Sequence, residues 1–362
     1  MKLLVFSPFY PPHIGGLESH SDEFNRHLSE RGFDITVFTP RLPIDATDHE
    51  TRHQNVTVVR FPACEPIHNY PFPKFWQMTF WREWHTLLHQ QPDIVISRTR
   101  FFFPSLMALW YSYRKNLPLV HIEHGSDFAQ FNGQLKTALG KGYDYLFGRF
   151  ILRHADGLIA NSQASARFVE ELSHRTDCQV IYRGANTEAI LATLPQQDIR
   201  ENASGKTIIA FIGRLIDGKG AHDLLNACAL LKRDDILCLI IGGGPEEARL
   251  KRLATELHLD QLVRFYGNLP FEEAISILKT ADIVVNPSYT EGLPTSVTEA
   301  ALCQKAIIAT DVGGTREVIS GQDDGVLVPP RHPEIIAEKI LFLMENPEQR
   351  TLFSQNAFLN VE

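Results

Sequence analysis

The sequence predicts an α/β protein made of two Rossmann-like domains, each built on a parallel β-sheet. Short apolar runs bounded by turn residues alternate with amphipathic segments of helical length, which is typical of βαβ units. Two such series follow one another along the chain. The 362 residues also exceed the size at which one hydrophobic core usually keeps growing, so two domains are expected.

The expected strands fall into two groups of comparable size. In the first domain, residues 1–192, they are the apolar runs at 2–7, 34–39, 56–61, 93–97, 117–124, 157–161 and 179–183. In the second domain, residues 207–362, they are the runs at 207–213, 236–242, 262–267, 282–287, 305–310 and 325–329. Residues 193–206 are polar, contain Pro and Gly and lack apolar periodicity, so they are the expected linker. Ligands of open α/β sheets bind beyond the carboxyl ends of the strands, so we expect a cleft between two facing domains.

Composition excludes several classes of function. The chain is 44% hydrophobic with a formal net charge of −8, which argues against a duplex-DNA binder, so we expect no nucleic acid partner. Five cysteines with no metal-ligand spacing predict reduced thiols and a cytoplasmic protein. No apolar run is long enough for a membrane span. Any anionic ligand must therefore be met by cations placed locally.

One aromatic segment, residues 73–90, has two interpretations. Its Trp and Phe residues lie close to helical spacing, which favours a helix packed on the first sheet. The same aromatics beside Lys74, Arg82 and His85 also suit an interfacial helix at the inner face of a membrane or near a lipid-bearing acceptor.

Loops after the strands of the first domain could hold a ligand. Gly15 and Gly16 precede a helical segment, where backbone N–H groups can approach a phosphate, although a flexible turn is the alternative interpretation. The pattern is not G-x-G-x-x-G and the second strand lacks a following acid, so dehydrogenase chemistry is not favoured. His121 and His124 are three residues apart on a strand and face opposite sides, so they do not predict a metal site. His124, at the strand exit, is expected to act as a hydrogen-bonding or proton-handling group.

The second domain carries a stronger pattern. Arg214 and Lys219 lie in a glycine-flanked turn that leads into a helix, which predicts a charge-assisted diphosphate site without a P-loop. The three glycines at 242–244 are interpreted first as a structural turn. In EGLPTSVTEA, Pro294 is expected in the first turn of a helix, with Glu291 in the loop before it and Glu299 on its second turn. Carboxylates accept hydrogen bonds from sugar hydroxyls, so a sugar nucleotide would fit this arrangement.

In order and spacing, these motifs resemble those of the retaining glycosyltransferases of family 4, which have the GT-B fold of two facing Rossmann-like domains. The resemblance rests on the glycine pair, HGSDF at 124–128, GRLIDGKG at 213–220, GGGP at 242–245 and EGLPTSVTEA at 291–300, and it covers nearly the whole chain. It implies an acceptor-side first domain and a sugar-nucleotide-binding second domain. Relatives commonly have N-G-V-D where this chain has residues 183–186, and they continue into a crossing helix at about the point where this chain ends, so that helix is expected to be absent.

The resemblance also implies residue roles. His124, Arg214, Lys219 and Glu291 would do the catalytic work, with the two cations on the leaving diphosphate and Glu291 on the transferred sugar. The donor-binding residues would be Gly15, Gly16, Asn268, Leu269, Gly292, Leu293, Pro294, Thr295 and Glu299. Among them, Glu299 would hold the ribose, and Asn268 and Leu269 would border the base. Acceptor contacts would come mainly from the first domain, with Arg98 and Arg100 as candidates.

The expected function is transfer of a sugar, of the hexosyl class, from a nucleoside-diphosphate sugar to a glycan or lipid-linked acceptor in polysaccharide or glycolipid biosynthesis. No cofactor is expected, because the sugar nucleotide is a substrate. No D-x-D motif is placed for a metal, and the paired cations predict metal independence. Two alternatives remain open: a nucleotide-sugar epimerase on the same fold, and a non-catalytic nucleotide-sugar-binding protein.

Overall fold

The computed structural model describes residues 1–67, 70–129, 133–203 and 205–362. It divides into two compact units, Met1–Arg183 and Gly184–Glu362. The first domain was expected to end at 192 and the linker to cover 193–206, whereas residues 184–203 belong to the second unit and form helices there. Ser204 of the expected linker lies outside the described residues.

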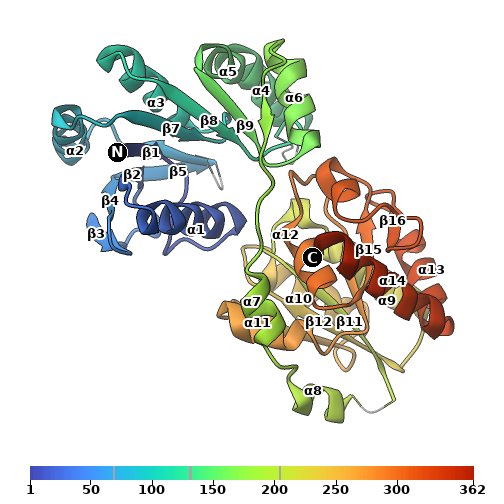
Figure 1. Ribbon diagram of the computed structural model, residues 1–362. Helices are drawn as coiled ribbons and strands as arrows, with labels where there is room; N and C mark the ends of the chain where they lie inside the picture. The colour runs from blue at the N-terminus through green and yellow to red at the C-terminus, as the bar shows by residue number, and fades with distance from the viewer. Residues whose placement is uncertain (68–69, 130–132, 204) are drawn as a thin grey trace. The chain divides into compact units, whose positions relative to one another are not determined.

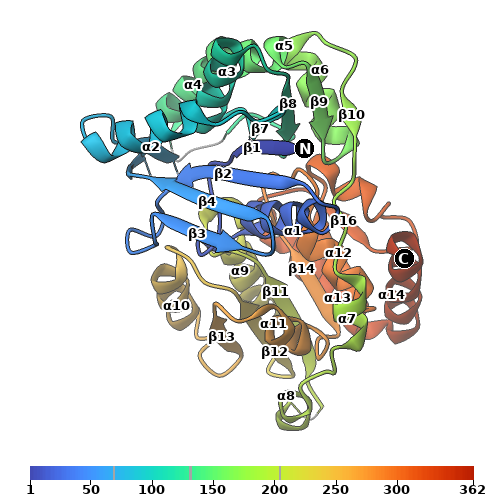
Figure 2. The same ribbon diagram turned by 60° about the vertical axis from the view of Figure 1, so that its left-hand side comes forward.

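The N-terminal unit is built on a sheet of eight strands in the order β10-β9-β8-β7-β1-β2-β4-β3 (Figure 2). Its strands are β1 (Lys2–Phe6), β2 (Asp34–Pro40), β3 (His49–Arg52), β4 (Val56–Phe61), β7 (Ile94–Arg98), β8 (Leu119–Glu123), β9 (Gly157–Ala160) and β10 (Gln179–Val180). All pair in parallel except β3, which runs antiparallel to β4. A separate hairpin pairs β5 (Ala63–Ile67) with β6 (Tyr70–Pro73).

Helices cover both faces of this sheet, because its central strands are apolar on both sides (Figure 1). The helices are α1 (Gly16–Glu30), α2 (Met78–His89), α3 (Phe103–Lys115), α4 (Gln134–Tyr143), η1 (Asp144–Gly148), α5 (Arg149–His154) and α6 (Gln163–Ser173). Helix α1 packs Phe24 and Leu28 on one face, and α2, α3, α5 and α6 pack on the other.

The C-terminal unit has a fully parallel sheet of six strands in the order β13-β12-β11-β14-β15-β16. Its strands are β11 (Thr207–Ile212), β12 (Ile236–Ile241), β13 (Val263–Gly267), β14 (Ile283–Asn286), β15 (Ala306–Thr310) and β16 (Val326–Val328). Alternate residues of β11 and β12 enter two different clusters of buried side chains, one on each face. The strand order reverses between β11 and β14, where a ligand site is expected in such a sheet.

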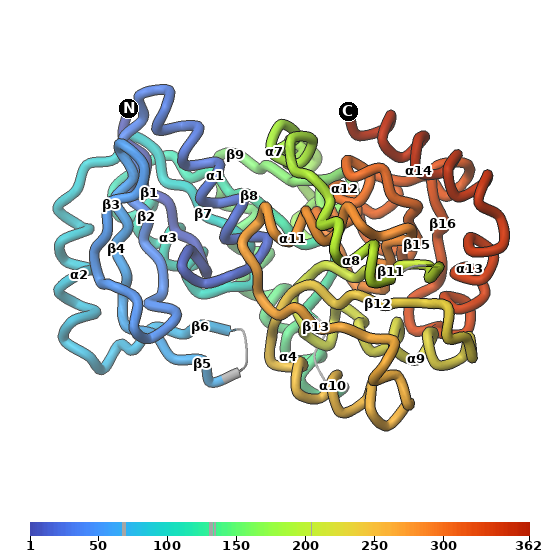
Figure 3. The backbone as a smooth tube through the Cα atoms, turned by 90° about the horizontal axis from the view of Figure 1, so that it is seen from below, coloured from blue at the N-terminus to red at the C-terminus, as the bar shows by residue number. Residues whose placement is uncertain are grey.

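Helices of this unit again lie on both faces, as the tube in Figure 3 shows from α7 to α14. They are α7 (Thr187–Ala192), α8 (Gln197–Asn202), η2 (Asp217–Lys219), α9 (Ala221–Leu231), α10 (Glu247–Glu256), α11 (Phe271–Leu278), α12 (Thr295–Leu302), η3 (Gly313–Glu317), α13 (Pro333–Glu345) and α14 (Pro347–Val361). The final helix, α14, contacts α12 and β15 of its own unit. Among the described residues, no helix is both long and apolar enough to cross a bilayer.

Candidate active site

In the C-terminal unit, the loop after β11 is locked against the loop after β14. Gly220, which ends the turn that carries Lys219, has φ 65°, and a Cβ there would collide with the carbonyl oxygen of Pro287. The backbone N–H of Tyr289 donates to the Gly218 carbonyl at 2.9 Å. Only glycine at position 220 allows this close approach, so the turn before α9 is held in place by backbone contacts.

Lys219 and Glu291 meet at this junction. Lys219 Nζ lies 2.5 Å from Glu291 Oε1. Glu291 is only 8% exposed, whereas the Lys219 side chain is 29% exposed. The pair therefore joins the β11 loop to the β14 loop and leaves the Lys219 side chain partly exposed. Arg214 is half-buried in the same β11 loop, so the structure brings both predicted cations and one predicted carboxylate to one edge of the sheet.

Helix α12 follows Glu291 after three residues. Pro294 lies just before the first helical residue, Thr295, rather than within the first turn, and has extended backbone angles. Glu299 is on the second turn, as predicted, and is half-buried. Asn286 Nδ2 donates to Ser296 Oγ at 2.6 Å, which ties the start of α12 to the end of β14. Gly292 and Leu293 occupy the loop between, where Leu293 packs partly on the core.

The triple-glycine turn after β12 supports the β11 loop, as its structural interpretation predicted. A Cβ on Gly242 or Gly244 would collide with the carbonyl oxygens of Gly213 and Leu215. The Gly243 N–H donates to Asn268 Oδ1 at 2.9 Å, and the Leu215 N–H donates to the Gly243 carbonyl at 2.9 Å. Asn268 thus positions this turn, and Leu269 beside it packs partly on the core.

Sequence reasoning missed Tyr289. Its hydroxyl donates to Asp223 Oδ2 at 2.9 Å and lies 2.8 Å from His222 Nε2. The Arg331 guanidinium stacks over its ring at 4.0 Å, and burial, followed by the hydrogen bond to Asp223, raises the pKa of the phenol. These contacts fix the loop between β14 and Glu291 to the first turn of α9. Nothing in the spacing of these residues along the chain signals the contact.

In the N-terminal unit, Gly15 and Gly16 lie at the start of α1. A Cβ on Gly15 would collide with the Glu18 carboxylate, whereas one on Gly16 would make only ordinary contact with Arg183 Nη1, 3.6 Å away. Glu18 is buried and contacts His13 Nδ1, and Arg183 Nη1 donates to the Gly16 carbonyl at 3.0 Å. The space beside Gly15 is therefore taken by a carboxylate, and Gly16 is the glycine that is exposed.

His124 directly follows β8, where Glu123 organises the strand end. Glu123 Oε1 accepts from the backbone N–H groups of His124 and Gly125 at 2.9 and 2.8 Å. The His124 ring meets the His20 ring edge-on at 5.1 Å. Its Nε2 is buried with no hydrogen-bond partner among the described residues. Burial, with a further contribution from Arg98, lowers the pKa of His124 to about 3, so it is neutral at physiological pH and suited to hydrogen bonding.

Arg100 does not fit the expected acceptor contact. It is 2% exposed and its guanidinium is 3.2 Å from Glu123 Oε2 and 3.0 Å from Asp144 Oδ2. The ion pair with Arg100 lowers the pKa of Glu123 against the opposing effect of burial. His121 is buried between Ser97 Oγ at 2.8 Å and Glu123 Oε2 at 3.3 Å. This network holds the end of β8, so the role of Arg100 is structural.

The aromatic segment at 73–90 contains α2, whose Phe80, Trp84 and Leu87 are buried in the core. The packed-helix interpretation therefore describes one face of α2. Its other side leaves Trp81 48% exposed, and Trp76, just before the helix, is 69% exposed.

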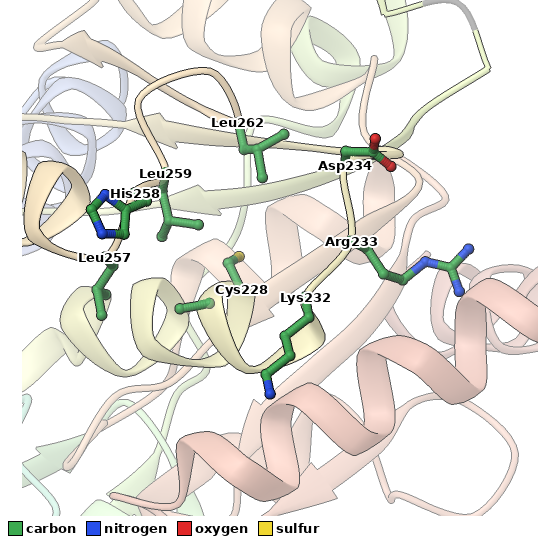
Figure 4. Close-up of a pocket in the computed structure, with 9 residues that line it drawn as sticks. Cys228, Lys232, Arg233, Asp234, Leu257, His258, Leu259 and Leu262 are labelled. Atoms are coloured by element: carbon green, nitrogen blue, oxygen red, sulfur yellow. The ribbon is translucent and has the colours of Figure 1, made fainter.

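A hollow of about 460 Å³ lies at the other end of the second sheet (Figure 4). It is lined by Lys232, Arg233 and Asp234, which precede β12, and by residues 257–259 and 262, which precede β13. It is therefore at the amino ends of the strands, away from the loops that carry Lys219 and Glu291.

Comparison with known proteins agrees with these features. Residues 195–359 match the family described as glycosyl transferases group 1, and residues 14–189 match glycosyltransferase family 4. A curated relative, an uncharacterized glycosyltransferase of Methanocaldococcus jannaschii, is 38% identical over 365 residues, covering 99% of this chain and 93% of the relative.

Solved structures show the same fold at lower identity. Sucrose-phosphate synthase of Thermosynechococcus elongatus has a TM-score of 0.81 at 20% identity and covers 99% of this chain and 94% of its own. The Anabaena protein HepE in complex with UDP and glucose has a TM-score of 0.79 at 21% identity, covering 100% and 94%. With two Rossmann-like units, the predicted motifs at their strand ends and these matches, the chain belongs to the group 1 glycosyltransferases of family 4, enzymes that transfer a sugar from a nucleotide sugar.

Proposed function

We propose that the protein is a retaining glycosyltransferase that moves a hexosyl group from a nucleoside-diphosphate sugar to a glycan or lipid-linked acceptor, in polysaccharide or glycolipid biosynthesis. The observation that carries this proposal is the contact of Lys219 with Glu291 at 2.5 Å, on two loops that glycine contacts lock together. In the reaction, the bond from the anomeric carbon to the diphosphate oxygen breaks, and the acceptor oxygen bonds to the anomeric carbon on the same face of the sugar. The proton of the acceptor hydroxyl passes to the leaving diphosphate.

The proposed chemistry is electrostatic. Negative charge grows on the leaving diphosphate, and Lys219 and Arg214 would stabilise it from fixed positions. The Lys219 ammonium can turn toward a phosphate without moving the backbone, because the side chain is partly exposed. Glu291 would then accept hydrogen bonds from hydroxyls of the transferred sugar. Two fixed cations can do the work of a divalent ion, so we propose metal independence.

The remaining predicted residues would bind the donor. Glu299 on α12 would accept hydrogen bonds from the ribose, with the loop from Gly292 to Thr295 beside it. Asn268 and Leu269 would border the base, and Gly15 and Gly16 the diphosphate. His124, held neutral by its surroundings, would donate or accept a hydrogen bond at the donor sugar. Relatives with UDP-glucose bound, such as HepE, make a uridine nucleotide the first donor to test.

We further propose a cytoplasmic protein whose exposed aromatics near α2 contact the inner face of the membrane. The support is Trp76 and Trp81, which are exposed beside the basic residues of the same segment. This contact would bring the enzyme to a lipid-linked acceptor.

A thermal-shift panel of nucleoside diphosphates and sugar nucleotides tests the donor assignment, because a ligand that binds the folded state raises its stability. We expect one nucleotide series to raise the midpoint and EDTA to leave that shift and the turnover unchanged. Loss of turnover in EDTA with recovery in magnesium would contradict metal independence. A changed sugar in the absence of any acceptor would favour the epimerase alternative.

A further inference from the structure

Three arginines are among the largest fully buried side chains, and one of them differs from the other two. Arg60 lies 2.7 Å from Glu50 Oε2, and Arg100 is paired with Glu123 and Asp144. Arg98 is 0% exposed and has no carboxylate within ion-pair distance among the residues that the structure describes. Its Nε and Nη2 are buried and have no hydrogen-bond partner in the part of the chain that the structure describes.

The contacts that Arg98 does make are weak ones. Its Nη1 lies 3.4 Å from His20 Nδ1, and its guanidinium is 4.9 Å from the centre of the Phe24 ring. Both partners are on α1. A neutral imidazole and an aromatic face compensate a buried guanidinium only in part, because a buried charge normally requires an opposite charge or a full set of hydrogen bonds.

The acids near the start of α1 are engaged elsewhere. Glu18, in the first turn, contacts His13, and Asp22 accepts from Arg52 at 2.9 Å and 3.0 Å. Burial and the Arg98 charge together lower the pKa of both histidines beside Arg98, to about 2 for His20 and about 3 for His124. Glu123 accepts from the backbone N–H of His124 but is already paired with Arg100. Among the described residues, no carboxylate is therefore paired with Arg98 itself.

Residues around Arg98 are partly exposed. Gly16 is exposed at the start of α1, and His20 and His124 are half-buried. Arg183, whose Nη1 reaches the Gly16 carbonyl at 3.0 Å, adds a second guanidinium at the same helix end. The Arg98 guanidinium lies further along this fifteen-residue helix, against His20 and Phe24 of its second and third turns. A buried guanidinium that has no paired carboxylate among the described residues favours an anion beside it.

We propose that Arg98 forms the floor of an oxyanion subsite in the N-terminal unit, which receives a phosphate or carboxylate group of the sugar acceptor. The inference rests on the proposed function, in which Arg214 and Lys219 already serve the donor diphosphate. The oxyanion replaces His20 as the partner of Arg98 Nη1 and also accepts a hydrogen bond from Arg98 Nη2. It can do so because a charge-assisted hydrogen bond is stronger than one to a neutral imidazole. The acceptor class is therefore anionic.

The first experiment titrates inorganic phosphate into the full-length chain at constant ionic strength, by calorimetry. We expect millimolar binding and at least about tenfold weaker binding in Arg98→Met, since a charged hydrogen-bonding pair is lost. Arg60→Met is the matched control, because it removes an equally buried but paired arginine and should leave phosphate binding unchanged. Phosphate that fails to bind the wild type, or binds Arg98→Met equally well, would overturn the subsite.

A second titration separates the acceptor from the donor as the source of the oxyanion. It uses the nucleoside diphosphate selected in the thermal-shift panel. The acceptor assignment predicts that Arg98→Met changes its affinity by less than about twofold; a larger loss would show that the donor diphosphate occupies the subsite and would overturn the assignment. If no nucleotide binds, the proposed function fails, whereas the phosphate titration still reports on the subsite.

Stability gives a third, independent test. Without phosphate, Arg98→Met should unfold at the same temperature as the wild type or higher, because it removes an unpaired buried charge, whereas Arg60→Met should unfold at a lower temperature. An equal drop in both variants would show that Arg98 is an ordinary structural arginine. Should Arg98→Met fail to fold, which would also count against the premise, Arg98→Lys tests the binding, since it keeps the charge but loses the planar fork.

Discussion

The two units place cations at the carboxyl ends of their parallel sheets, but they balance the charge in different ways. In the C-terminal unit, Lys219 is held 2.5 Å from Glu291. In the N-terminal unit, Arg98 is buried and no carboxylate is paired with it among the described residues. A paired cation is ready for a ligand while the protein stays stable without it. An unpaired buried cation lowers stability until an anion arrives, so its presence indicates an anionic ligand.

The largest effect on activity should come from removing Lys219, the cation that is paired with Glu291. Lys219→Ala should lower kcat by about a hundredfold or more, because one fixed donor to a developing negative charge is lost. Lys251→Ala is the control: Lys251 pairs with Glu247 at 2.7 Å on α10 of the same unit, and its removal should leave kcat unchanged. Wild-type turnover in Lys219→Ala would remove the basis for the assigned site.

A second variant tests whether the backbone holds this site in place. Gly220→Ala introduces a Cβ at φ 65° against the Pro287 carbonyl, which should lower the free energy of unfolding by about 2 kcal/mol or more. In Gly218→Ala, in the same turn, the added Cβ has no atom within 4 Å, and a small change is expected. Urea unfolding of both variants measures the difference. Equal stabilities would mean that the turn is not locked.

The ribose contact should have a smaller effect. Glu299→Ala should weaken nucleoside diphosphate binding by about tenfold, since a charged acceptor of a hydrogen bond is lost. The exposed Glu256 at the end of α10 provides the control variant Glu256→Ala. Titration calorimetry measures the nucleoside diphosphate affinity of the two variants. An unchanged affinity in Glu299→Ala would mean that the ribose does not contact Glu299.

The smallest effect concerns the surroundings of the unpaired Arg98, where the neighbouring His124 should make folding stability depend on pH. The pKa of His124 is lowered to about 3, so the folded state keeps this imidazole neutral while the unfolded chain takes up a proton below about pH 6.5. Folding stability contributed by the neutral ring is therefore full above pH 6.5 and is lost as the pH falls toward 3, by about 1.4 kcal/mol per pH unit for one such histidine. The groups facing it are His20, Arg98, Arg183, His121 and Glu123.

His124→Asn should reduce the loss of unfolding free energy between pH 6.5 and pH 5, a range above the one in which Glu123 titrates. The exposed His154 supplies the control His154→Asn, which should keep the wild-type slope. Urea unfolding at the two pH values gives the slope. The same slope in His124→Asn as in the wild type would show that His124 titrates normally in the folded protein.

Much of the fold could be predicted from the sequence, because buried parallel strands are continuous apolar runs. Every expected strand is present. The strands β3, β5 and β6 were not expected. Strand β3 has the sequence HETR, which is polar and half exposed, so no apolar pattern marks it. The boundary was expected too late, because the polar stretch after 192 contains Ile199, which is buried in the second unit.

Some features of the candidate site could likewise be predicted from the sequence and others could not. The positions of Lys219, Glu291 and Glu299 in the fold could be predicted, because each lies in a loop after a strand or in a short helix that the sequence marks with Gly or Pro. Their roles in the site stay predictions. The pairing of Arg100 with Glu123 and Asp144, and the lack of such a partner for Arg98, depend on contacts between residues far apart in the chain. The two arginines are two positions apart in the sequence and looked equivalent there; only the structure separates a structural arginine from a candidate binding residue.

The most direct test of the central claim is calorimetric titration of the selected nucleoside diphosphate into three proteins: the wild type, Lys219→Ala and Arg98→Met. We expect the affinity to fall at least about tenfold in Lys219→Ala and to stay at the wild-type value in Arg98→Met. The reverse pattern, with affinity lost in Arg98→Met and kept in Lys219→Ala, would contradict this expectation.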